Sequence, residues 1–354
     1  MAGGTGGHVF PALAVARSLK EQAQDVVWLG TQQGIEARII PAAGIEIEWL
    51  SVKGLRKKGW LALIHAPFQL LRALFQALAV MRRRRPAAVL GMGGFASGPG
   101  GVAAWLLGKP LVIHEQNAAA GLTNRLLARL ARVVLQAFPG AFKARTDVET
   151  VGNPVREDIA SLAAPAERYG SRSGALHLLV LGGSQGARAL NQTVPAALAL
   201  LPKDLQPIVR HQCGERTQAV AHEAYAGSGI EVELLPFIDD MAAAYGWADL
   251  VVCRAGALTV AELCAAGLPA LFVPYPAAVD DHQTANARPM ANAGAAEIVC
   301  EAGLTAELLA ERLKAWLLDR SVLQQRAESA RALASPDSLA RITHICLSVA
   351  GVSA

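Results

Sequence analysis

The 354-residue sequence predicts an α/β protein built from two doubly wound domains. Short apolar runs rich in Val, Leu and Ile recur along the chain, as expected of strands that are buried on both faces of a parallel sheet. Several runs end in a glycine-rich loop that leads into a segment of helical composition. This order of glycine loop and helix occurs in both halves, at 3–20 and again at 182–201. The repetition suggests two Rossmann-like domains that face each other across a cleft.

Composition supports two domains of ordinary size. A hydrophobic content of 53% with only 18% charged residues excludes a disordered chain. The formal net charge is +4, so nucleic acid is not an expected partner. The 5 cysteines are scattered and never spaced C-x-x-C, which predicts a reducing compartment without a disulfide framework or a structural zinc site. The chain opens on glycines in place of a basic and then apolar stretch, so we expect no signal peptide.

The first half begins with the glycine-rich loop MAGGTGGH, followed by a helical segment. A loop of this kind normally follows a buried strand, and none precedes it here. We therefore expect the first sheet to lack its central strand and to expose the flanks of the neighbouring strands. Further strands are predicted at 26–29, 45–48, 88–90, 111–114, 133–135 and 150–151. The polar, Ala/Pro/Ser-rich run at 157–174 predicts an interdomain linker.

The stretch 60–81 (WLALIHAPFQLLRALFQALAVM) predicts a mostly apolar helix that leads into the arginines at 82–85. It is about long enough to span a bilayer. A spanning helix is nevertheless disfavoured, because polar residues and a proline interrupt the stretch: His65, Pro67, Gln69, Arg72 and Gln76. Two interpretations remain. The helix is either part of the core, with a basic C-terminal end, or it lies in a membrane interface with its arginines on anionic headgroups.

The second half repeats the plan of the first. Strands are predicted at 176–181, 208–211, 232–235, 250–253 and 270–273, and helices at 187–201, 307–316 and 323–333. A last amphipathic helix at about 337–354 could cross back onto the first domain. The sequence therefore predicts one domain from 1–156 plus that helix, and a second from 157–336.

The stretch 249–274 (DLVVCRAGALTVAELCAAGLPALFVP) predicts a βαβ unit with a ligand site. Its helix starts in a small-residue loop, where free backbone N–H groups and the helix dipole favour an anion such as phosphate. Glu262 lies about one turn into that helix, where a carboxylate could accept hydrogen bonds from the two hydroxyls of a ribose. An ordinary crossover with a surface glutamate accounts for the same residues.

Several nucleotide and metal motifs are absent from the sequence. The third glycine position of G-x-G-x-x-G is Val9, and Leu29 is followed by Gly30 and Thr31 in place of an acidic residue, so an NAD site is disfavoured. The sequence has no G-x-x-x-x-G-K-[ST], no H-E-x-x-H and no D-x-D. The charge of a bound diphosphate would then be met by backbone amides, a helix N-terminus and an arginine.

Eight stretches, taken in order, resemble the MurG family of inverting GT-B glycosyltransferases. They are GGTGGHVFPALAVA (3–16), GMGGFASGPGG (91–101), HEQNAAAGLTN (114–124), GNPVR (152–156), GGSQGARALN (182–191), FIDDM (237–241), RAGALTVAEL (254–263) and DDHQTANA (280–287). The family adds N-acetylglucosamine to lipid I to give lipid II. The resemblance therefore implies peptidoglycan synthesis, with links to cell shape and cell division.

The resemblance also implies a location and partners. Lipid I carries an undecaprenyl tail and stays in the bilayer, so the enzyme would dock peripherally on the cytoplasmic face of the bacterial inner membrane. For residues 60–85, the resemblance therefore favours a helix in the membrane interface over a helix of the core. Anionic lipids, and cell-wall or division proteins, are the partners that would follow. No cofactor is required, and assistance by a divalent cation is left open.

The resemblance implies UDP-GlcNAc as the donor, bound mainly by the second domain. Glu262 would take the ribose hydroxyls, Ile238 would pack by the uracil, and Arg156 would lie near the nucleotide. Ser184 and the start of the helix would hold the diphosphate and the donor: Ala257, Leu258, Thr259, Val260 and Ala261. Gln283 and Asn117 would contact the sugar. Thr5, Gly6 and Gly7, with the loop at 93–94, would face the acceptor pyrophosphate and the reacting sugar.

His8 is the first candidate for the catalytic base. Inversion needs a group that takes the proton of the acceptor hydroxyl, and imidazole is suited to this at neutral pH. Alternatively, His8 only donates a hydrogen bond to a phosphate. Glu115 is the second candidate base, although a carboxylate that caps the adjacent helix explains it equally well, and His114 is interpreted as structural. Phe95 stands where a tyrosine is common in the family.

Alternatives to this function come from two classes. Within enzymes, another GT-B protein that uses UDP-GlcNAc, or a UDP-GlcNAc 2-epimerase, would share the donor site. Outside enzymes, a catalytically silent scaffold could bind a nucleotide sugar and recruit partners to the membrane. Product formed from UDP-GlcNAc alone would favour the epimerase. A scaffold would respond to loss of His8 or Glu262 only in its nucleotide affinity.

Overall fold

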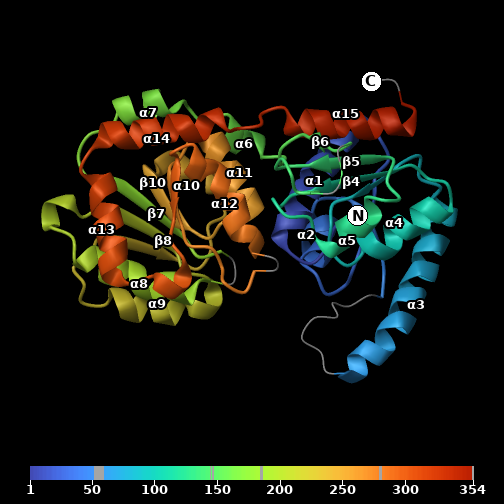
Figure 1. Ribbon diagram of the computed structural model, residues 1–354, viewed down its shortest axis with the longest axis horizontal. Helices are drawn as coiled ribbons and strands as arrows, with labels where there is room; N and C mark the ends of the chain where they lie inside the picture. Colours follow the sequence, from blue (N-terminus) through green and yellow to red (C-terminus); the bar gives the residue numbers. More distant parts are fainter. Residues whose placement is uncertain (52–59, 144, 146, 184–185, 279–280, 353–354) are drawn as a thin grey trace. The chain divides into compact units, whose positions relative to one another are not determined.

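The computed structural model (Figure 1) describes residues 1–51, 60–143, 145, 147–183, 186–278 and 281–352, with the backbone alone for 60–66. The chain divides into two compact units. Unit 1 comprises Met1–Val155 and Ser335–Ala354, and unit 2 comprises Arg156–Ala334. Both carry parallel sheets with helices, which confirms the predicted α/β class.

Unit 2 is built on a six-stranded parallel sheet in the order β12-β11-β10-β7-β8-β9. The chain runs outward from β7 to β9, returns to β10 beside β7, and then continues in the opposite direction. Doubly wound sheets bind ligands beyond the carboxyl ends of their strands at such a reversal, here between β7 and β10. The strands are β7 (His177–Leu181), β8 (Ile208–Gln212), β9 (Val232–Leu235), β10 (Leu250–Cys253), β11 (Ala270–Phe272) and β12 (Ala296–Ile298).

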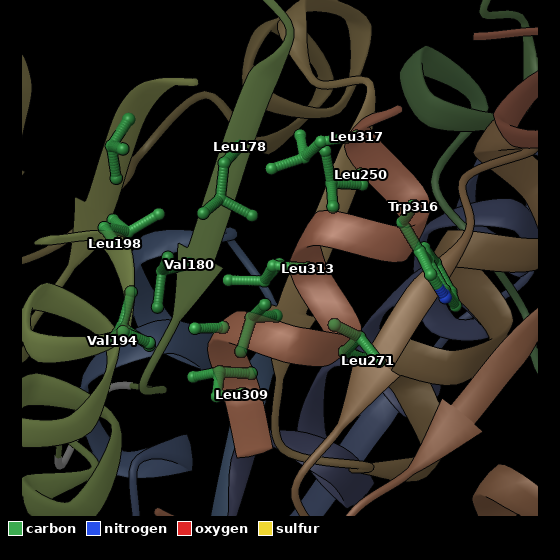
Figure 2. Packing of buried hydrophobic residues seen from close by; sticks show 14 of the residues in the cluster. Leu178, Val180, Val194, Leu198, Leu250, Leu271, Leu309, Leu313, Trp316 and Leu317 are labelled. Carbon is green, nitrogen blue, oxygen red and sulfur yellow. The ribbon is translucent and has the colours of Figure 1, made fainter. Parts of the chain in front are cut away.

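The core of unit 2 lies where two helices cover the sheet. Figure 2 shows side chains of β7, β10 and β11 against those of α8 and α13. Leu178, Leu250 and Leu313 are fully buried there. From β7 onward, the helices of this unit are α8 (Arg188–Ala199), α9 (Gln218–Tyr225), α10 (Met241–Trp247), α11 (Ala257–Ala266), α12 (His282–Asn292), α13 (Ala306–Leu317) and α14 (Arg320–Ala332), with 3-10 turns at Lys203–Leu205, Glu215–Thr217 and Glu301–Gly303. This packing fixes the strand ends on which the loops of the site are mounted.

The predicted linker at 157–174 is wrong. Its residues form α6 (Glu157–Ala160) and α7 (Pro165–Gly170), which belong to unit 2. The buried Arg168 guanidinium donates to the carbonyls of Ala266 (2.5 Å) and Gly267 (2.7 Å) at the C-terminal end of α11. The buried Tyr169 hydroxyl donates to the carbonyl of Asp249. Long-range hydrogen bonds to main-chain carbonyls order this segment, and a polar composition gives no sign of them.

Unit 1 holds parallel strands in a two-stranded sheet, β1-β2, and a four-stranded sheet, β3-β4-β5-β6. All predicted strands are present, with ends that shift slightly. They are β1 (Val27–Gly30), β2 (Glu46–Trp49), β3 (Val89–Gly91), β4 (Leu111–Glu115), β5 (Val133–Gln136) and β6 (Glu149–Thr150). The helices are α1 (Gly6–Glu21), α2 (Glu36–Ala42), α3 (Trp60–Arg84), α4 (Ser97–Leu106), α5 (Leu122–Leu127) and α15 (Ser338–Ala350). α15 packs against α1 and contributes the buried Ile342 to the same core cluster as Val9.

Met1 lies beside β3, at the position that the central strand of a doubly wound sheet normally takes. Its amino group donates to the carbonyl of Leu90 (2.7 Å) and its carbonyl accepts from the amide of Met92 (2.9 Å), as one residue of a parallel strand would. A cavity of about 260 Å³, lined by residues that include Trp28 and Val89, adjoins it. Both of these side chains are buried, whereas Val27 and Leu90, which also line the cavity, are partly exposed, so the prediction that the strand flanks are exposed is confirmed only in part. The helices α1 and α15 contribute further lining residues.

Helix α3 has one buried and one exposed side. Ala73, Ala77 and Met81, four residues apart, are buried in a cluster that also contains residues of α4. Phe68 and Phe75 are 70% and 67% exposed. Within the described part of the chain, no helix combines the length and the apolar character that crossing a membrane requires.

Candidate functional site

The start of α11 has the geometry of an anion site at the sheet reversal of unit 2. Gly256 precedes the helix in an extended conformation (φ −63°, ψ 141°), and no side chain of the described residues caps the helix. The amides of Leu258 and Thr259 come before Val260, whose amide donates to the carbonyl of Gly256 (2.9 Å). No acidic residue lies in the first turn. The amides of Leu258 and Thr259, at the positive end of the helix dipole, are therefore suited to a phosphate.

Glu262 points into the interior of unit 2 and is held by a tyrosine. The residue is 9% exposed, so the alternative of a surface glutamate is wrong. Its Oε2 accepts a hydrogen bond of 2.9 Å from the hydroxyl of Tyr245 in α10. Burial raises the pKa of the Glu262 carboxyl to about 7, against the lowering effects of that hydrogen bond and of the Arg156 charge. Tyr245 thus fixes Oε2, and no hydrogen bond to Oε1 comes from the residues that the structure describes.

The other predicted donor residues of unit 2 have separate surroundings. Arg156 is the N-cap of α6, which packs against α11, and its exposed side chain lies 3.9 Å from Asp158. Ile238 is buried in the segment between β9 and α10. Gln283 in α12 accepts a hydrogen bond of 2.9 Å from the amide of Tyr275. Ser184 lies outside the described residues.

The first glycine loop of unit 1 ends in a second uncapped helix start. α1 begins at Gly6, earlier than predicted, and Thr5 is its N-cap without a side-chain hydrogen bond. The amides of His8 and Val9 both donate to the carbonyl of Thr5 at 3.2 Å, so the amides of Gly6 and Gly7 come before the first helical bonds. The exposed position of Thr5 and the absence of acidic residues in the first turn suit an anionic ligand.

A buried carboxylate, which sequence reasoning missed, holds this loop. Glu36 is fully buried and accepts hydrogen bonds from the amides of Gly4 (3.0 Å) and Thr31 (3.1 Å) and from the Thr31 hydroxyl (2.7 Å). A Cβ on Gly3 would lie 2.5 Å from Glu36 Oε1. The loop is therefore glycine-rich partly because it wraps around Glu36. The sequence shows only an acidic residue at the start of a short helix.

The two glycine loops of unit 1 touch main chain to main chain. Gly94 has a left-handed φ of +85°, and a Cβ there would lie 2.2 Å from the carbonyl oxygen of Gly3. Next to it, a Cβ on Gly93 would lie 2.9 Å from His8 Nδ1 and Cε1. The second loop therefore sets the position of both the first loop and His8.

Replacing Gly94 with alanine is expected to lower the free energy of unfolding by about 2–4 kcal/mol, since the left-handed backbone and the clash with Gly3 add together. Urea denaturation of the full chain measures this loss. Gly140→Ala is the matched control, because Gly140 has a φ of +81° and open space around it. Equal losses in the two variants would contradict the close contact of the loops.

His8 lies in a hydrogen-bonded row of side chains. Its Nδ1 is 2.7 Å from Gln116 Oε1, Gln116 Nε2 is 2.9 Å from His114 Nδ1, and His114 Nε2 is 2.9 Å from the carbonyl of Gly152. His114 is fully buried, as its structural interpretation requires, and burial lowers its pKa to about 4. Gln116 was missed by the sequence analysis, although it stands between the two named residues Glu115 and Asn117.

Glu115 is surrounded by donors. Its Oε1 accepts from the amide (3.0 Å) and the side chain (3.1 Å) of Asn117, and its Oε2 accepts from the amide of Gly121 (3.1 Å) and the side chain of Asn124 (2.9 Å). Gly121 is the N-cap of α5, and Glu115 is buried. This geometry favours the capping interpretation over a base. Among the described residues, no three His, Cys, Asp or Glu side chains are grouped as a metal site would need.

Comparison with known proteins identifies the family. Residues 1–136 match the glycosyltransferase family 28 N-terminal domain, and residues 177–342 match the glycosyltransferase family 28 C-terminal domain. The chain is 61% identical over 350 residues to a protein of Alkalilimnicola ehrlichii named UDP-N-acetylglucosamine–N-acetylmuramyl-(pentapeptide) pyrophosphoryl-undecaprenol N-acetylglucosamine transferase, covering 98% of this chain and 97% of that one. A Nitrosococcus oceani protein of the same name is 56% identical, with coverage of 99% and 98%. The crystal structure of Acinetobacter baumannii MurG is 42% identical with a TM-score of 0.86, covering 98% of each chain. The chain belongs to the MurG family.

Membership of the MurG family confirms the resemblance and the enzyme class that the sequence motifs predict, a glycosyltransferase. The N-terminal family domain ends with β5 in unit 1, and the C-terminal one begins with β7 and extends into α15. Both uncapped helix starts, of α1 and of α11, therefore lie within matched domains. Phe95, which replaces the tyrosine common in the MurG family, is 47% exposed.

Proposed function

We propose that this chain transfers N-acetylglucosamine from UDP-GlcNAc to the C4 hydroxyl of the MurNAc of lipid I, with inversion at C1, and so makes lipid II for peptidoglycan synthesis. The observation that carries the proposal is the pairing of an uncapped α11 start with the tyrosine-held carboxylate of Glu262 at the sheet reversal. The relatives reported above bear the name of this transferase. Lipid II synthesis would link the enzyme to cell shape and cell division.

In this proposal unit 2 binds the donor. A ribose diol would donate to Glu262, and the diphosphate would accept from the main-chain amides at the start of α11, with Ser184 as a further partner. Uracil would pack by Ile238, Arg156 would lie near the nucleotide, and the sugar would contact Gln283 and, from unit 1, Asn117. Val260 and Ala261 continue the helix between the diphosphate and ribose positions.

Unit 1 would bind the acceptor and supply the base. The start of α1 and the loop at Gly93 and Gly94 present amides suited to a pyrophosphate. His8 would take the proton of the C4 hydroxyl as its oxygen forms the bond to C1. The bond between C1 and the phosphate oxygen breaks, and its electron pair leaves on UDP. The α11 amides and dipole would stabilise that developing charge.

A transfer assay tests the proposal directly. The full chain, incubated with radiolabelled UDP-GlcNAc and a lipid I analogue, is expected to yield labelled lipid II and unlabelled UDP. Isomerised UDP-sugar formed without acceptor would contradict the proposal in favour of an epimerase. Tight UDP-GlcNAc binding with no turnover on lipid I would contradict it in favour of a scaffold.

We further propose that the exposed side of α3 docks the enzyme on the cytoplasmic face of the inner membrane. Phe68, Leu71 and Phe75 lie on one side of the helix and are all more than half exposed. Arg82 and Arg85 at the helix end are exposed, whereas Arg83 and Arg84 pair with Glu48 of β2 at 2.7 Å each. Apolar side chains beside basic ones suit an anionic bilayer surface, which also holds the acceptor. Division and cell-wall proteins remain partners that lipid II synthesis suggests.

Vesicle sedimentation tests this surface. Replacing Phe68 and Phe75 together with serine is expected to weaken binding to vesicles with anionic phosphatidylglycerol by about 10-fold or more, because two aromatic side chains no longer enter the interface. Leu318→Ser in unit 2 is the control, since Leu318 is 62% exposed. Docking through α3 would be contradicted by equal binding of the three proteins.

A further inference from the structure

The donor and the acceptor of each hydrogen bond in the row His8–Gln116–His114–Gly152 can be assigned in turn, starting from the carbonyl of Gly152. A main-chain carbonyl can only accept, so His114 Nε2, 2.9 Å from the carbonyl of Gly152, carries a proton. The low pKa of His114 keeps the ring neutral, so its Nδ1 is an acceptor. The partner of that nitrogen, Gln116 Nε2 at 2.9 Å, is therefore the donor.

A second contact fixes the orientation of the Gln116 amide. Gln116 Nε2 also lies 3.1 Å from the carbonyl oxygen of His114, where an amide oxygen would face another acceptor. The main-chain carbonyl of Gln116 accepts a hydrogen bond of 3.0 Å from the side chain of Asn153, which holds the residue in place. With Nε2 turned to His114, the amide oxygen faces His8 Nδ1 at 2.7 Å. An oxygen there requires a proton on Nδ1.

We propose that Gln116 and His114 are positioning residues that hold His8 in the Nδ1–H tautomer, so that Nε2 is the basic atom of the transfer reaction. The role in transfer rests on the proposed function. His8 is half-buried, and no hydrogen bond to its Nε2 comes from the described residues. When Nε2 takes the acceptor proton, Nδ1 keeps its own proton and its bond to Gln116. His8 can therefore accept the proton without any change in its hydrogen bond to Gln116.

The opposite arrangement is disfavoured at two contacts. If His8 carried its proton on Nε2, the Gln116 amide would have to turn around and place its oxygen against the His114 carbonyl. His114 would then need a proton on Nδ1, and as a neutral ring it would present a bare Nε2 to the carbonyl of Gly152. Both contacts would bring two acceptors together in a buried site.

Nitrogen-15 NMR of the imidazole rings in the full chain tests the tautomer. At a pH where the ring is neutral, the His8 signals, assigned through His8→Asn, are expected to show the Nδ1–H pattern. Gln116→Met, which keeps the side-chain length but removes the strong donor and acceptor, is expected to shift His8 toward Nε2–H. A wild-type Nε2–H pattern, or an unchanged pattern in Gln116→Met, would overturn the assignment.

Kinetics test the positioning role. Gln116→Met is expected to lower kcat by about 10²-fold with KM for UDP-GlcNAc unchanged, because the base is misoriented. Gln136→Met is the matched control: Gln136 is a buried glutamine of neighbouring β5, and its amide binds Thr150 (2.9 Å) and Ala141 (3.1 Å). Equal losses of kcat in the two variants would overturn the role. A wild-type chain without transferase activity would contradict the proposed function. The tautomer could still be tested in that case, because the NMR measurement needs no turnover.

Discussion

Replacing His8 with alanine is expected to lower kcat for lipid II formation by about 10²–10⁴-fold, the contribution of a positioned general base. The acceptor hydroxyl would then have to lose its proton to water. KM for UDP-GlcNAc should stay nearly constant, because the proposed donor contacts come mainly from unit 2. Steady-state kinetics with a lipid I analogue measure both parameters.

The control for His8 is His344→Ala, which removes an exposed histidine from α15 in the same unit. Its kinetics should match the wild type. A loss of less than about 10-fold in kcat for His8→Ala would argue that His8 only binds a phosphate. In that case KM for the acceptor would rise while kcat changed little, since such a contact serves binding more than chemistry.

Replacing Glu262 with alanine is expected to weaken UDP binding by about 10²-fold or more, since two hydrogen bonds to a charged acceptor are lost. Isothermal titration with UDP measures this directly and needs no acceptor. Glu311→Ala, an exposed glutamate of α13, is the control. Unchanged UDP affinity in Glu262→Ala would contradict the ribose contact.

The pKa of Glu262 gives this prediction a pH signature. Ribose hydroxyls donate best to an ionised carboxylate, so UDP affinity should rise as the pH passes upward through about 7. Stability should change in the opposite direction. The folded pKa is raised from 4.5 to about 7, so the folded chain binds more protons than the unfolded one between these values. The stabilisation present below the unfolded pKa is lost as the pH rises through the folded one, by up to about 3 kcal/mol.

The variant Glu262→Gln shows whether the pH dependence of UDP affinity and of stability comes from Glu262 or from other titrating groups. Glutamine does not titrate, so both the rise in affinity and the fall in stability across this pH range should flatten. Titration calorimetry with UDP and urea denaturation at pH 5, 6, 7 and 8 measure them. An unaltered pH profile in Glu262→Gln would show that another group titrates.

The strands could be predicted because their cause is local. β7 and β10 are apolar runs bounded by glycine and polar residues, and their burial follows from that pattern. Gly267 ends α11 in a left-handed conformation with φ +61°, a helix stop that glycine favours and that is equally local in the sequence. The helix α7 could not be predicted, because Arg168 and Tyr169 are buried through bonds to residues about 80 to 100 positions away.

The candidate site likewise contains residues that the sequence predicts and residues that only the fold reveals. Glu262 is predictable from its place one turn into a helix that follows a glycine loop. Its partner Tyr245 is not, because α10 has no motif and the two residues meet only in the folded unit. The contact between His8 and Gln116 spans 108 positions. Sequence motifs thus give the candidates for ligand contact, and the fold supplies the side chains that orient them.

The placement of α15 has a consequence for biosynthesis. This helix belongs to unit 1 but follows all of unit 2 along the chain. On the ribosome, residues 156–334 emerge and can fold while the apolar side of α1, including Val9 and Leu13, still waits for Ile342. The half of the molecule that is translated first is thus completed last, and its unfinished surface is open to chaperones during synthesis.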